Sequence, residues 1–182
     1  REFQIFSLHG QTKDALAKTK AGSWEYDIII PGYKCNMTDI MASIGLVQLD
    51  RYPKLLERRL ELVEQYNEGF KGSKVKPLVH NTKDHKSSNH LYITHVEGAT
   101  FEQRGEIITK MAERGISCNV HYKPLPLLTA YKNLGFDMND YPNAYSYYVN
   151  EVTLPLHTRL SDEDVDVIVE NFKEVIAEVV GE

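Results

Sequence analysis

This chain is organised around one stretch, Pro31–Asp50, which reads PGYKCNMTDIMASIGLVQLD. It begins with a proline-glycine turn signal, and Thr38 or Asp39 then opens a helix. Lys34 and Asn36 stand in the short loop that leads into this helix. Free backbone N–H groups and the positive end of the helix dipole favour an anion at such a place, a phosphate group in particular. A loop that only caps a helix has the same local pattern, so these residues alone leave both interpretations open.

Residues 38–49 are predicted to form a short helix that is apolar nearly all round. Gly45 has no side chain, which allows another element to approach this helix closely. We therefore expect the helix to be buried, at a contact with another subunit. Pro53 is well placed to begin a second helix, which Gly72 ends.

The rest of the chain has the pattern of a small α+β domain. Residues 10–31 are polar and predict an irregular loop, and residues 72–89 predict a linker or flexible loop. β-branched and aromatic content, capping signals and apolar periodicity predict strands at 90–96, 116–122 and 152–156, and helices at 100–114, 127–135, 142–150 and from Ser161 onward. Residues 51–182 thus form a small domain, whereas residues 1–50 look like part of something larger.

Composition limits the function classes. The chain has 182 residues, 42% of them hydrophobic, and a formal net charge of −5 with both signs interspersed. This charge pattern argues against a nucleic-acid partner or a charged membrane surface. No apolar run approaches the roughly 20 residues that a membrane span needs, and no signal peptide is visible. The two cysteines, Cys35 and Cys118, are too few for a disulfide framework, so we expect reduced thiols and a cytoplasmic protein.

Metal and nucleophile motifs are weak in this sequence. Histidines recur every fifth residue from His80 to His95, but this spacing places them on no common face of a strand or helix, so we expect no metal site. His121 and Tyr122 end a predicted strand and meet a loop that prolines constrain. Such a position either exposes side chains to a ligand or, by strand alternation, buries one of them in the core. The residues themselves do not decide between these two roles.

A family resemblance adds to this interpretation. The run GYKCNMTDIMASIGLVQLDRYPKLLERR resembles the glycine-tyrosine loop and following helices of the DegT/DnrJ/EryC1/StrS aminotransferases. Three further runs resemble family motifs in the same order along the chain: SSNHLYITHV, VHYKPLPLLTAY and EVTLPLHTRLSDEDVD. The matching loop and helix positions are Gly32, Tyr33, Lys34, Asn36, Met37, Thr38, Asp39, Gly45, Gln48, Leu49, Arg58 and Arg59, with Cys35 in place of the usual aromatic residue.

The resemblance implies a fold and an organisation. It implies the small C-terminal domain of a fold-type I pyridoxal-phosphate (PLP) aminotransferase, with a three-stranded antiparallel sheet and helices, over residues 51–182. Residues 1–50 would be a remnant of the large domain that carries the cofactor-phosphate loop and a dimer-contact helix. The Schiff-base lysine of the family lies upstream in the large domain, and no such run is found here. We therefore expect this chain to be a C-terminal portion of the enzyme, inactive by itself.

The resemblance also implies roles for particular residues. Asn36, Lys34 and Tyr33 would bind the cofactor, with Asn36 and Lys34 at its phosphate across a dimer. His121 and Tyr122 would bind substrate.

The activity that the resemblance implies is amination of a nucleotide-linked keto-sugar. The amino group would come from glutamate through PLP, in a homodimer, for cell-surface polysaccharide or amino-sugar biosynthesis. Two alternatives stay open. One is a non-catalytic truncated relative that serves as a dimerisation or sugar-nucleotide-binding module, and the other is a PLP-dependent sugar dehydratase.

Overall fold

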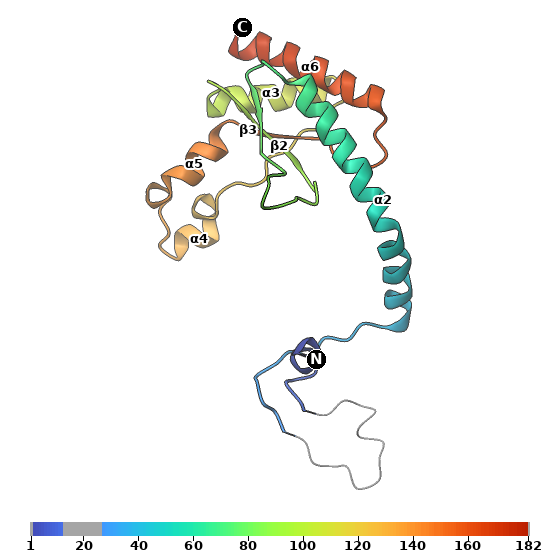
Figure 1. Ribbon diagram of the computed structural model, residues 1–182. Coiled ribbons are helices and arrows are strands. Elements are labelled where there is room, and N and C mark those ends of the chain that lie inside the picture. Colours follow the sequence, from blue (N-terminus) through green and yellow to red (C-terminus); the bar gives the residue numbers. More distant parts are fainter. Residues whose placement is uncertain (1, 13–26, 182) are drawn as a thin grey trace. The chain divides into compact units, whose positions relative to one another are not determined.

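The computed structural model describes residues 2–12 and 27–181 and divides into two compact units, one ending at Arg51 and the other beginning at Tyr52 (Figure 1). We call residues 2–12 and 27–51 the first unit and residues 52–181 the second unit. The predicted loop at 10–31 lies partly outside the described residues, because 13–26 are not among them. Each unit is described by itself below.

The helix α2, Asp39–Gly69, is one continuous element of 31 residues that begins in the first unit and continues into the second. The prediction of two separate helices was wrong, because Pro53 lies inside α2 and does not begin a new helix. A proline in a helix leaves the carbonyl group four residues earlier without its donor. The good helix formers on both sides, such as Gln48 and Lys54, favour continuation.

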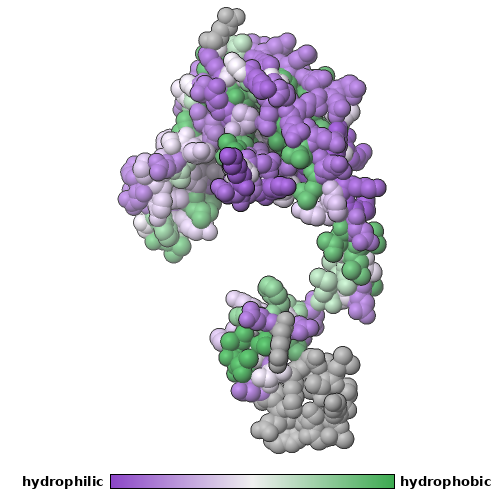
Figure 2. Space-filling view, viewed as in Figure 1, coloured by the Kyte–Doolittle hydropathy of each residue, from purple (hydrophilic) through white to green (hydrophobic). Residues whose placement is uncertain are grey.

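The first turns of α2 are exposed in this single chain, so the expected burial at a contact with another subunit stays a prediction. Exposed fractions of Ile40, Met41, Ile44 and Leu46 run from 53% to 74% in this chain. Figure 2 shows apolar residues on more than one side of this stretch. The described residues of the first unit supply no surface that buries these side chains.

The second unit contains a three-stranded antiparallel sheet, which confirms the α+β fold class. The strands are β1 (Val75–Pro77), β2 (Tyr92–Val96) and β3 (Glu151–Leu154), in the order β1-β2-β3. Tyr92 is opposite Leu154 and Val75 is opposite Val96.

Two of the three strand positions were predicted correctly and one was not. The predicted linker at 72–89 contains β1. The predicted strand at 116–122 is reduced to one bridge, in which Asn119 pairs with Thr153. Two bonds make this bridge, from the Asn119 N–H to the Thr153 carbonyl at 3.0 Å and back at 2.8 Å. The prolines at 124 and 126 follow at once, and such residues do not continue a sheet ladder.

The helices of the second unit divide between the two faces of the sheet. Figure 1 shows α3 (Phe101–Glu113) and α6 (Asp162–Val180) side by side, with α4 (Thr129–Asn133) and α5 (Pro142–Val149) grouped elsewhere. Short 3-10 turns, η2 (Leu125–Leu127) and η3 (Met138–Asp140), precede α4 and α5. The predicted caps of α3 and α6 are both present, and in the structure each of them is a capping box.

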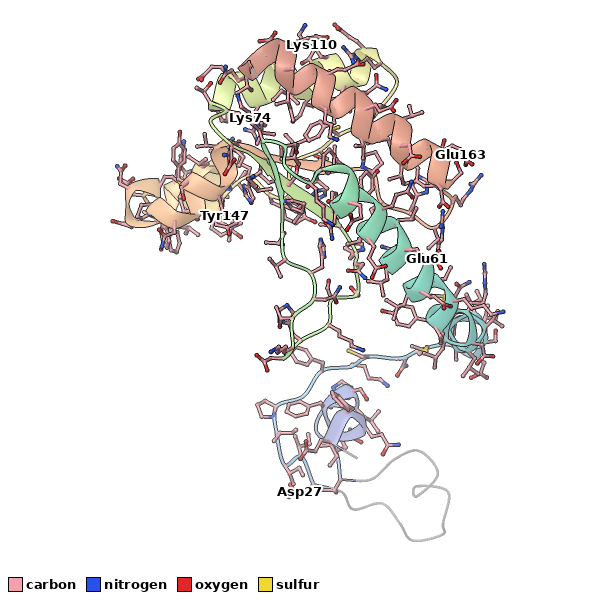
Figure 3. The ribbon with its side chains drawn as sticks, turned by 45° about the horizontal axis from the view of Figure 1, so that its top comes forward. Asp27, Glu61, Lys74, Lys110, Tyr147 and Glu163 are labelled. Atoms are coloured by element: carbon pink, nitrogen blue, oxygen red, sulfur yellow. The ribbon has the colours of Figure 1, made fainter. Side chains whose placement is uncertain are left out.

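The core lies between one face of the sheet and the helices α2, α3 and α6. Its residues include Leu62, Tyr66, Phe70, Tyr92, Val96, Ile107, Met111, Val152, Leu154, Val165 and Phe172. Ion pairs join α3 to α6 at the surface, where Arg114 bonds Glu174 and Glu178, and Lys110, labelled in Figure 3, bonds Glu178. None of the described helices combines the length and apolar composition that crossing a membrane requires.

Arg58 and Arg59 connect α2 to neighbouring segments. Arg58 donates to the Leu160 carbonyl oxygen and to Asp162, both at 2.8 Å. Arg59 donates at 2.9 Å to the carbonyl oxygen of Asn89, a buried residue just before β2. Both side chains therefore position backbone, and the sequence pattern did not reveal this.

Candidate functional site

The loop before α2 is held by backbone pairing with the end of α1 (Glu2–Ser7) and the residues that follow it. The Tyr33 N–H donates to the Phe6 carbonyl oxygen at 2.7 Å, and the Cys35 N–H donates to the Ser7 carbonyl oxygen at 2.9 Å. The His9 N–H donates to the Tyr33 carbonyl oxygen at 2.8 Å. These bonds fix the loop backbone between the turn and the helix.

Two glycines make this pairing sterically possible. A Cβ atom at Gly32 would lie 2.6 Å from the Gly10 nitrogen and 2.7 Å from the Phe6 carbonyl oxygen. Gly10 has a φ of 78°, and a Cβ atom there would lie only 1.8 Å from the Ile30 carbonyl oxygen. Any side chain at either position would push the loop away from α1 and the turn that follows it.

Lys34 and Asn36 contact each other at the exposed side of this loop. The Lys34 Nζ donates to the Asn36 Oδ1 at 2.7 Å. The bond occupies the acceptor of the amide and leaves its NH₂ group, together with further ammonium hydrogens, as donors. Donors of this kind, one of them charged, fit a phosphate group. Tyr33, the third predicted cofactor residue, is 74% exposed beside them.

The start of α2 has an N-cap, but the positive end of its helix dipole is offset by a nearby carboxylate. Thr38 accepts from the Met41 N–H at 3.3 Å and precedes the helix, as predicted. Asp39 places a carboxylate in the first turn, and this charge opposes a bound anion. Phosphate binding would therefore depend on Lys34 and Asn36 more than on the helix end.

The second candidate site is built on the free edge of β3. The Asn119–Thr153 bridge places His121 beside the strand. The His121 N–H donates to the Glu151 Oε2 at 3.0 Å, and the His121 Nδ1 lies 2.9 Å from the Thr153 Oγ1. The Thr153 Oγ1 donates to the Glu151 Oε1 at 2.5 Å. Backbone and side-chain bonds together fix both the main chain and the ring of His121.

These side chains lie on the face of the sheet that does not carry the main core. Val152 and Leu154 point into the core, so Glu151 and Thr153 point to the opposite face by strand alternation. His95 of β2 lies on that face as well, opposite Glu151. The helix α5 covers part of it, and Figure 3 labels its Tyr147, whose ring packs nearly perpendicular to the His95 ring with 4.5 Å between the ring centroids.

A hollow of about 130 Å³ opens here, and His121, Tyr122, Tyr147, Tyr148 and Glu151 line it together with apolar side chains. Tyr122 is 73% exposed and its ring stands edge-on to His121 at 4.6 Å. Aromatic walls with a few fixed polar groups are typical of small-molecule sites. The structure thus brings the two predicted substrate residues together at one hollow.

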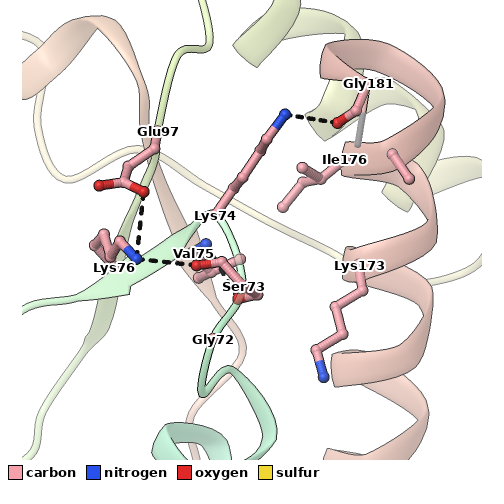
Figure 4. A pocket seen from close by; sticks show the side chains of 10 residues that line it. Gly72, Ser73, Lys74, Val75, Lys76, Glu97, Lys173, Ile176 and Gly181 are labelled. Atoms are coloured by element: carbon pink, nitrogen blue, oxygen red, sulfur yellow. Dashed lines mark hydrogen bonds and ion pairs between the residues drawn. The ribbon is translucent and has the colours of Figure 1, made fainter.

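Another hollow, of about 500 Å³, lies between the start of β1 and the end of α6 (Figure 4). Its lysines have structural contacts: the Lys74 Nζ donates to the Gly181 carbonyl oxygen at 2.8 Å, and the Lys76 Nζ pairs with Glu97 at 3.2 Å. The first contact satisfies a carbonyl group at the end of α6. We therefore assign no ligand to this hollow.

The remaining reactive side chains form no centre of their own. Within residues 2–12 and 27–181, no group of three or more histidine, cysteine or acidic side chains is arranged to hold a metal ion. Burial raises the pKa of the Cys118 thiol to about 12, so this thiol stays protonated at neutral pH and is a poor nucleophile.

The pattern of a known family covers most of this chain. The pattern of the DegT/DnrJ/EryC1/StrS aminotransferase family matches residues 1–173. The chain belongs to this aminotransferase family.

Solved structures and curated relatives agree with the family assignment. A Streptococcus pneumoniae chain described as a sugar aminotransferase in its PMP form is 67% identical, with a TM-score of 0.86 over 98% of this chain and 45% of that one. The Bacillus subtilis spore coat polysaccharide biosynthesis protein SpsC is 35% identical over 96% of this chain and 46% of that protein. The Helicobacter pylori UDP-4-amino-4,6-dideoxy-N-acetyl-beta-L-altrosamine transaminase is 29% identical over 90% of this chain and 42% of that protein. The chain thus spans less than half the length of each of these proteins.

Two members of the second site were not predicted from the sequence. Thr153 lay inside the predicted strand at 152–156 and Glu151 just before it, and neither was singled out within the run EVTLPLHTRLSDEDVD. Their alternation with Val152 and Leu154 was the available signal, because it places two polar side chains on one face. The contact between Lys34 and Asn36 was also missed, although their spacing of two residues along an extended loop permits it.

Proposed function

We propose that this chain is part of a PLP-dependent enzyme that transfers an amino group from glutamate to a nucleotide-linked keto-sugar, for polysaccharide or amino-sugar biosynthesis in the cytoplasm. The observation that carries the proposal is the loop at 31–37, which holds Lys34 and Asn36 as paired donors before α2 in a chain of the aminotransferase family. Bound PLP supplies the electron sink that amino-group transfer needs. In this proposal, the residues of this chain bind the cofactor and the substrate and orient them.

In this proposal the loop holds the phosphate group of the cofactor. The ammonium group of Lys34 and the amide NH₂ of Asn36 donate to phosphate oxygens, and the exposed ring of Tyr33 packs beside the cofactor. Backbone bonds to Phe6 and Ser7 fix the loop before the cofactor arrives, so little ordering cost remains. No lysine of this chain is given the role of carrying the cofactor, and we expect the chain alone to be inactive.

The substrate residues in the proposal are His121 and Tyr122. Both line the hollow beside β3, where the ring of Tyr122 offers an apolar face and a hydroxyl group. Such groups suit a sugar, which presents hydroxyl groups on an apolar ring.

The proposal includes a homodimer in which the loop serves the partner's cofactor. Its support is the apolar surface of α2, where Ile40, Met41 and Ile44 are more than half exposed. Contiguous exposed apolar surface of this kind marks an interaction site.

Transfer of nitrogen is the direct test. The complete protein is incubated with PLP, ¹⁵N-labelled glutamate and a nucleotide-linked keto-sugar, and the sugar product is analysed by mass spectrometry. We expect ¹⁵N in the sugar. Loss of sugar oxygen without gain of nitrogen would instead identify the dehydratase, and an unchanged sugar across a panel of nucleotide-linked keto-sugars would favour the non-catalytic module.

The role of the loop is tested by cofactor affinity. Asn36→Ala removes a hydrogen bond to a charged group, worth about 1.5–3 kcal/mol, and should weaken PLP binding roughly ten- to a hundredfold. Lys34→Ala should also weaken PLP binding, and its effect should shrink as salt rises, because the lysine charge is exposed to solvent. The matched control is Asn133→Ala, at an exposed asparagine of α4. Unchanged PLP affinity in an intact Asn36→Ala dimer would leave Asn36 as a loop residue only.

A further inference from the structure

The hydrogen bonds around His121 have directions that follow from the chemistry of their donors. The backbone N–H of His121 donates to one oxygen of Glu151, and the Thr153 hydroxyl donates to the other. Both bonds thus run toward Glu151, whose two carboxyl oxygens accept them. The single proton of the Thr153 hydroxyl is therefore used in the bond to Glu151.

The ring of His121 must then be the donor in its own bond to Thr153. The Nδ1 of His121 lies 2.9 Å from the Thr153 Oγ1, which has only lone pairs left to offer. A neutral imidazole carries its proton on one nitrogen and a lone pair on the other. The proton therefore resides on Nδ1, and Nε2 carries the lone pair.

Burial strengthens the hydrogen bonds that join His121, Thr153 and Glu151. Glu151 and Thr153 are each only 4% exposed, and hydrogen bonds strengthen where water is excluded. The Nε2 of His121, by contrast, has no hydrogen-bond partner among the described residues and is not buried. The ring lines the hollow with Tyr122 and Tyr147, so its free nitrogen is available to a ligand there.

We propose that Thr153 and Glu151 are positioning residues that hold His121 as the Nδ1–H tautomer, so that Nε2 accepts a hydrogen bond from a hydroxyl group of the substrate. The identity of the substrate as a sugar rests on the proposed function, whereas the tautomer does not. Because the Nε2 of His121 can only accept in this tautomer, it favours a substrate hydroxyl group, which can donate, over a substrate group that can only accept. This preference makes His121 a specificity residue, and Glu151 and Thr153 act through it.

His95 provides an internal comparison on the same face of the sheet. Its Nδ1 lies 3.2 Å from the Asn150 Oδ1, and the amide NH₂ of Asn150 donates to the Val96 carbonyl oxygen at 3.0 Å. The amide oxygen can only accept, so His95 also carries its proton on Nδ1. Its Nε2, however, is buried without a partner among the described residues, and the ring edge packs on Tyr147. The two histidines share a tautomer, but only His121 can offer its free nitrogen.

The tautomer is measured by long-range ¹H–¹⁵N NMR on the ¹⁵N-labelled chain at about pH 8, where an ordinary histidine is neutral. We expect His121 and His95 to show a protonated Nδ1 and an unprotonated Nε2. In Glu151→Gln, the new amide NH₂ can donate to the Thr153 Oγ1, so the hydroxyl proton turns to His121 and the tautomer reverses to Nε2–H. In Thr153→Val the acceptor is lost, and His121 should return toward the mixture of a free imidazole, whereas Thr153→Ser keeps the Nδ1–H form.

The signals of His95 report whether each variant is still folded. Nε2–H on His121 in the unsubstituted chain would overturn the proposal. A His121 tautomer that stays the same in both Glu151→Gln and Thr153→Val, with unchanged His95 signals, would overturn it as well. If either Glu151→Gln or Thr153→Val does not fold, the His121 tautomer in the other variant, compared with that in Thr153→Ser, still tests the proposal.

The second measurement uses the complete enzyme and separates this inference from the proposed function. Thr153→Val should raise KM for the nucleotide-linked sugar by roughly three- to tenfold, the worth of one neutral hydrogen bond, with PLP affinity unchanged. Thr153→Ser should restore KM. Absence of any amino transfer in the unsubstituted enzyme would refute the proposed function and leave the tautomer result standing. Normal turnover with an unaltered KM in Thr153→Val would refute the positioning role of Thr153 and Glu151 alone.

Discussion

The two units of this chain are stabilised in different ways. In the second unit, large side chains such as Tyr66, Tyr92 and Phe172 are fully buried between the sheet and three helices. In the described part of the first unit, Gly10 alone is buried, and the side chains of Ile40 and Ile44 are exposed. Backbone hydrogen bonds and close glycine contacts hold the first unit, whereas apolar burial holds the second.

This difference shows where each unit has its stabilising surface. Burial of apolar area is the main favourable term in folding, and the second unit obtains it from its own residues. The first unit leaves comparable apolar side chains exposed. It can therefore gain stability from apolar burial only where another surface covers them. In the proposed function, that surface belongs to the homodimer.

A pair of identical truncations should separate the units most clearly. Ile107→Ala removes a fully buried side chain of α3 and should lower the free energy of unfolding by about 2–5 kcal/mol. Ile44→Ala removes a half-exposed side chain of α2 and should change it by no more than about 0.5 kcal/mol. Urea unfolding of the chain, followed by circular dichroism, measures both.

Light scattering on the same two variants completes this test. Ile44→Ala should weaken self-association, because it reduces the exposed apolar surface of α2, whereas any folded Ile107→Ala protein should associate normally. Equal losses of folding stability in the two variants would mean that α2 is packed within the monomer, and the contrast between the units would be wrong.

A second pair tests the close glycine contacts of the first unit. Gly10→Ala places a Cβ atom against the Ile30 carbonyl oxygen in a left-handed backbone conformation and should destabilise the local structure by more than about 1 kcal/mol. The amide of Ile29, which donates to the Gly10 carbonyl oxygen, should then exchange its hydrogen at least about fivefold faster.

Gly45→Ala is the matched control for this prediction. Nothing lies within 4 Å of a Cβ atom at Gly45, and alanine favours a helix by about 0.8–1.0 kcal/mol over glycine. This variant should therefore stabilise α2. An unchanged exchange rate at Ile29 in Gly10→Ala would show that the turn tolerates a side chain by moving without loss of the pairing.

The sequence was most informative where one local signal decides the structure. The capping box at Thr100 and the cap at Ser161 placed the starts of α3 and α6 correctly, because these bonds join residues three positions apart. Thr38 placed the start of α2 for the same reason. The small α+β domain was predicted from the strand and helix patterns of residues 51–182, and its antiparallel sheet from the family resemblance.

The errors arose where distant residues decide the outcome. The break predicted at Pro53 did not occur, since the flanking residues favour one helix despite a lost hydrogen bond. The strand predicted at 116–122 has β-rich composition, but only Asn119 pairs with β3. Glu151 and Thr153 became part of a site only through a segment about thirty residues earlier. Pairing of this kind depends on tertiary contacts that local propensity does not contain.

The smallest predicted effect is a pH dependence of the second unit at His80. The ring of His80 stacks on the Tyr92 ring at 6.0 Å, and its Nε2 is buried without a partner among the described residues. Burial lowers the pKa of His80, because the charged form loses solvation. Below the unfolded pKa of about 6.5, the unfolded chain therefore binds more protons than the folded chain. Stability should fall as the pH drops from about 7.5 through that value, until the folded pKa is also passed.

His80→Phe tests this prediction, because phenylalanine keeps a flat ring beside Tyr92 and has no proton to gain. The variant should lose less stability than the unsubstituted chain between about pH 7.5 and pH 5, whatever the constant cost of the substitution. His157→Phe, at an exposed histidine, is the control and should leave the pH dependence unchanged. Urea unfolding at the two pH values gives the comparison. If the two variants show the same pH dependence, the buried Nε2 of His80 does not contribute to acid sensitivity, and the proton-linked stability of the second unit must be sought at its other histidines or carboxylates.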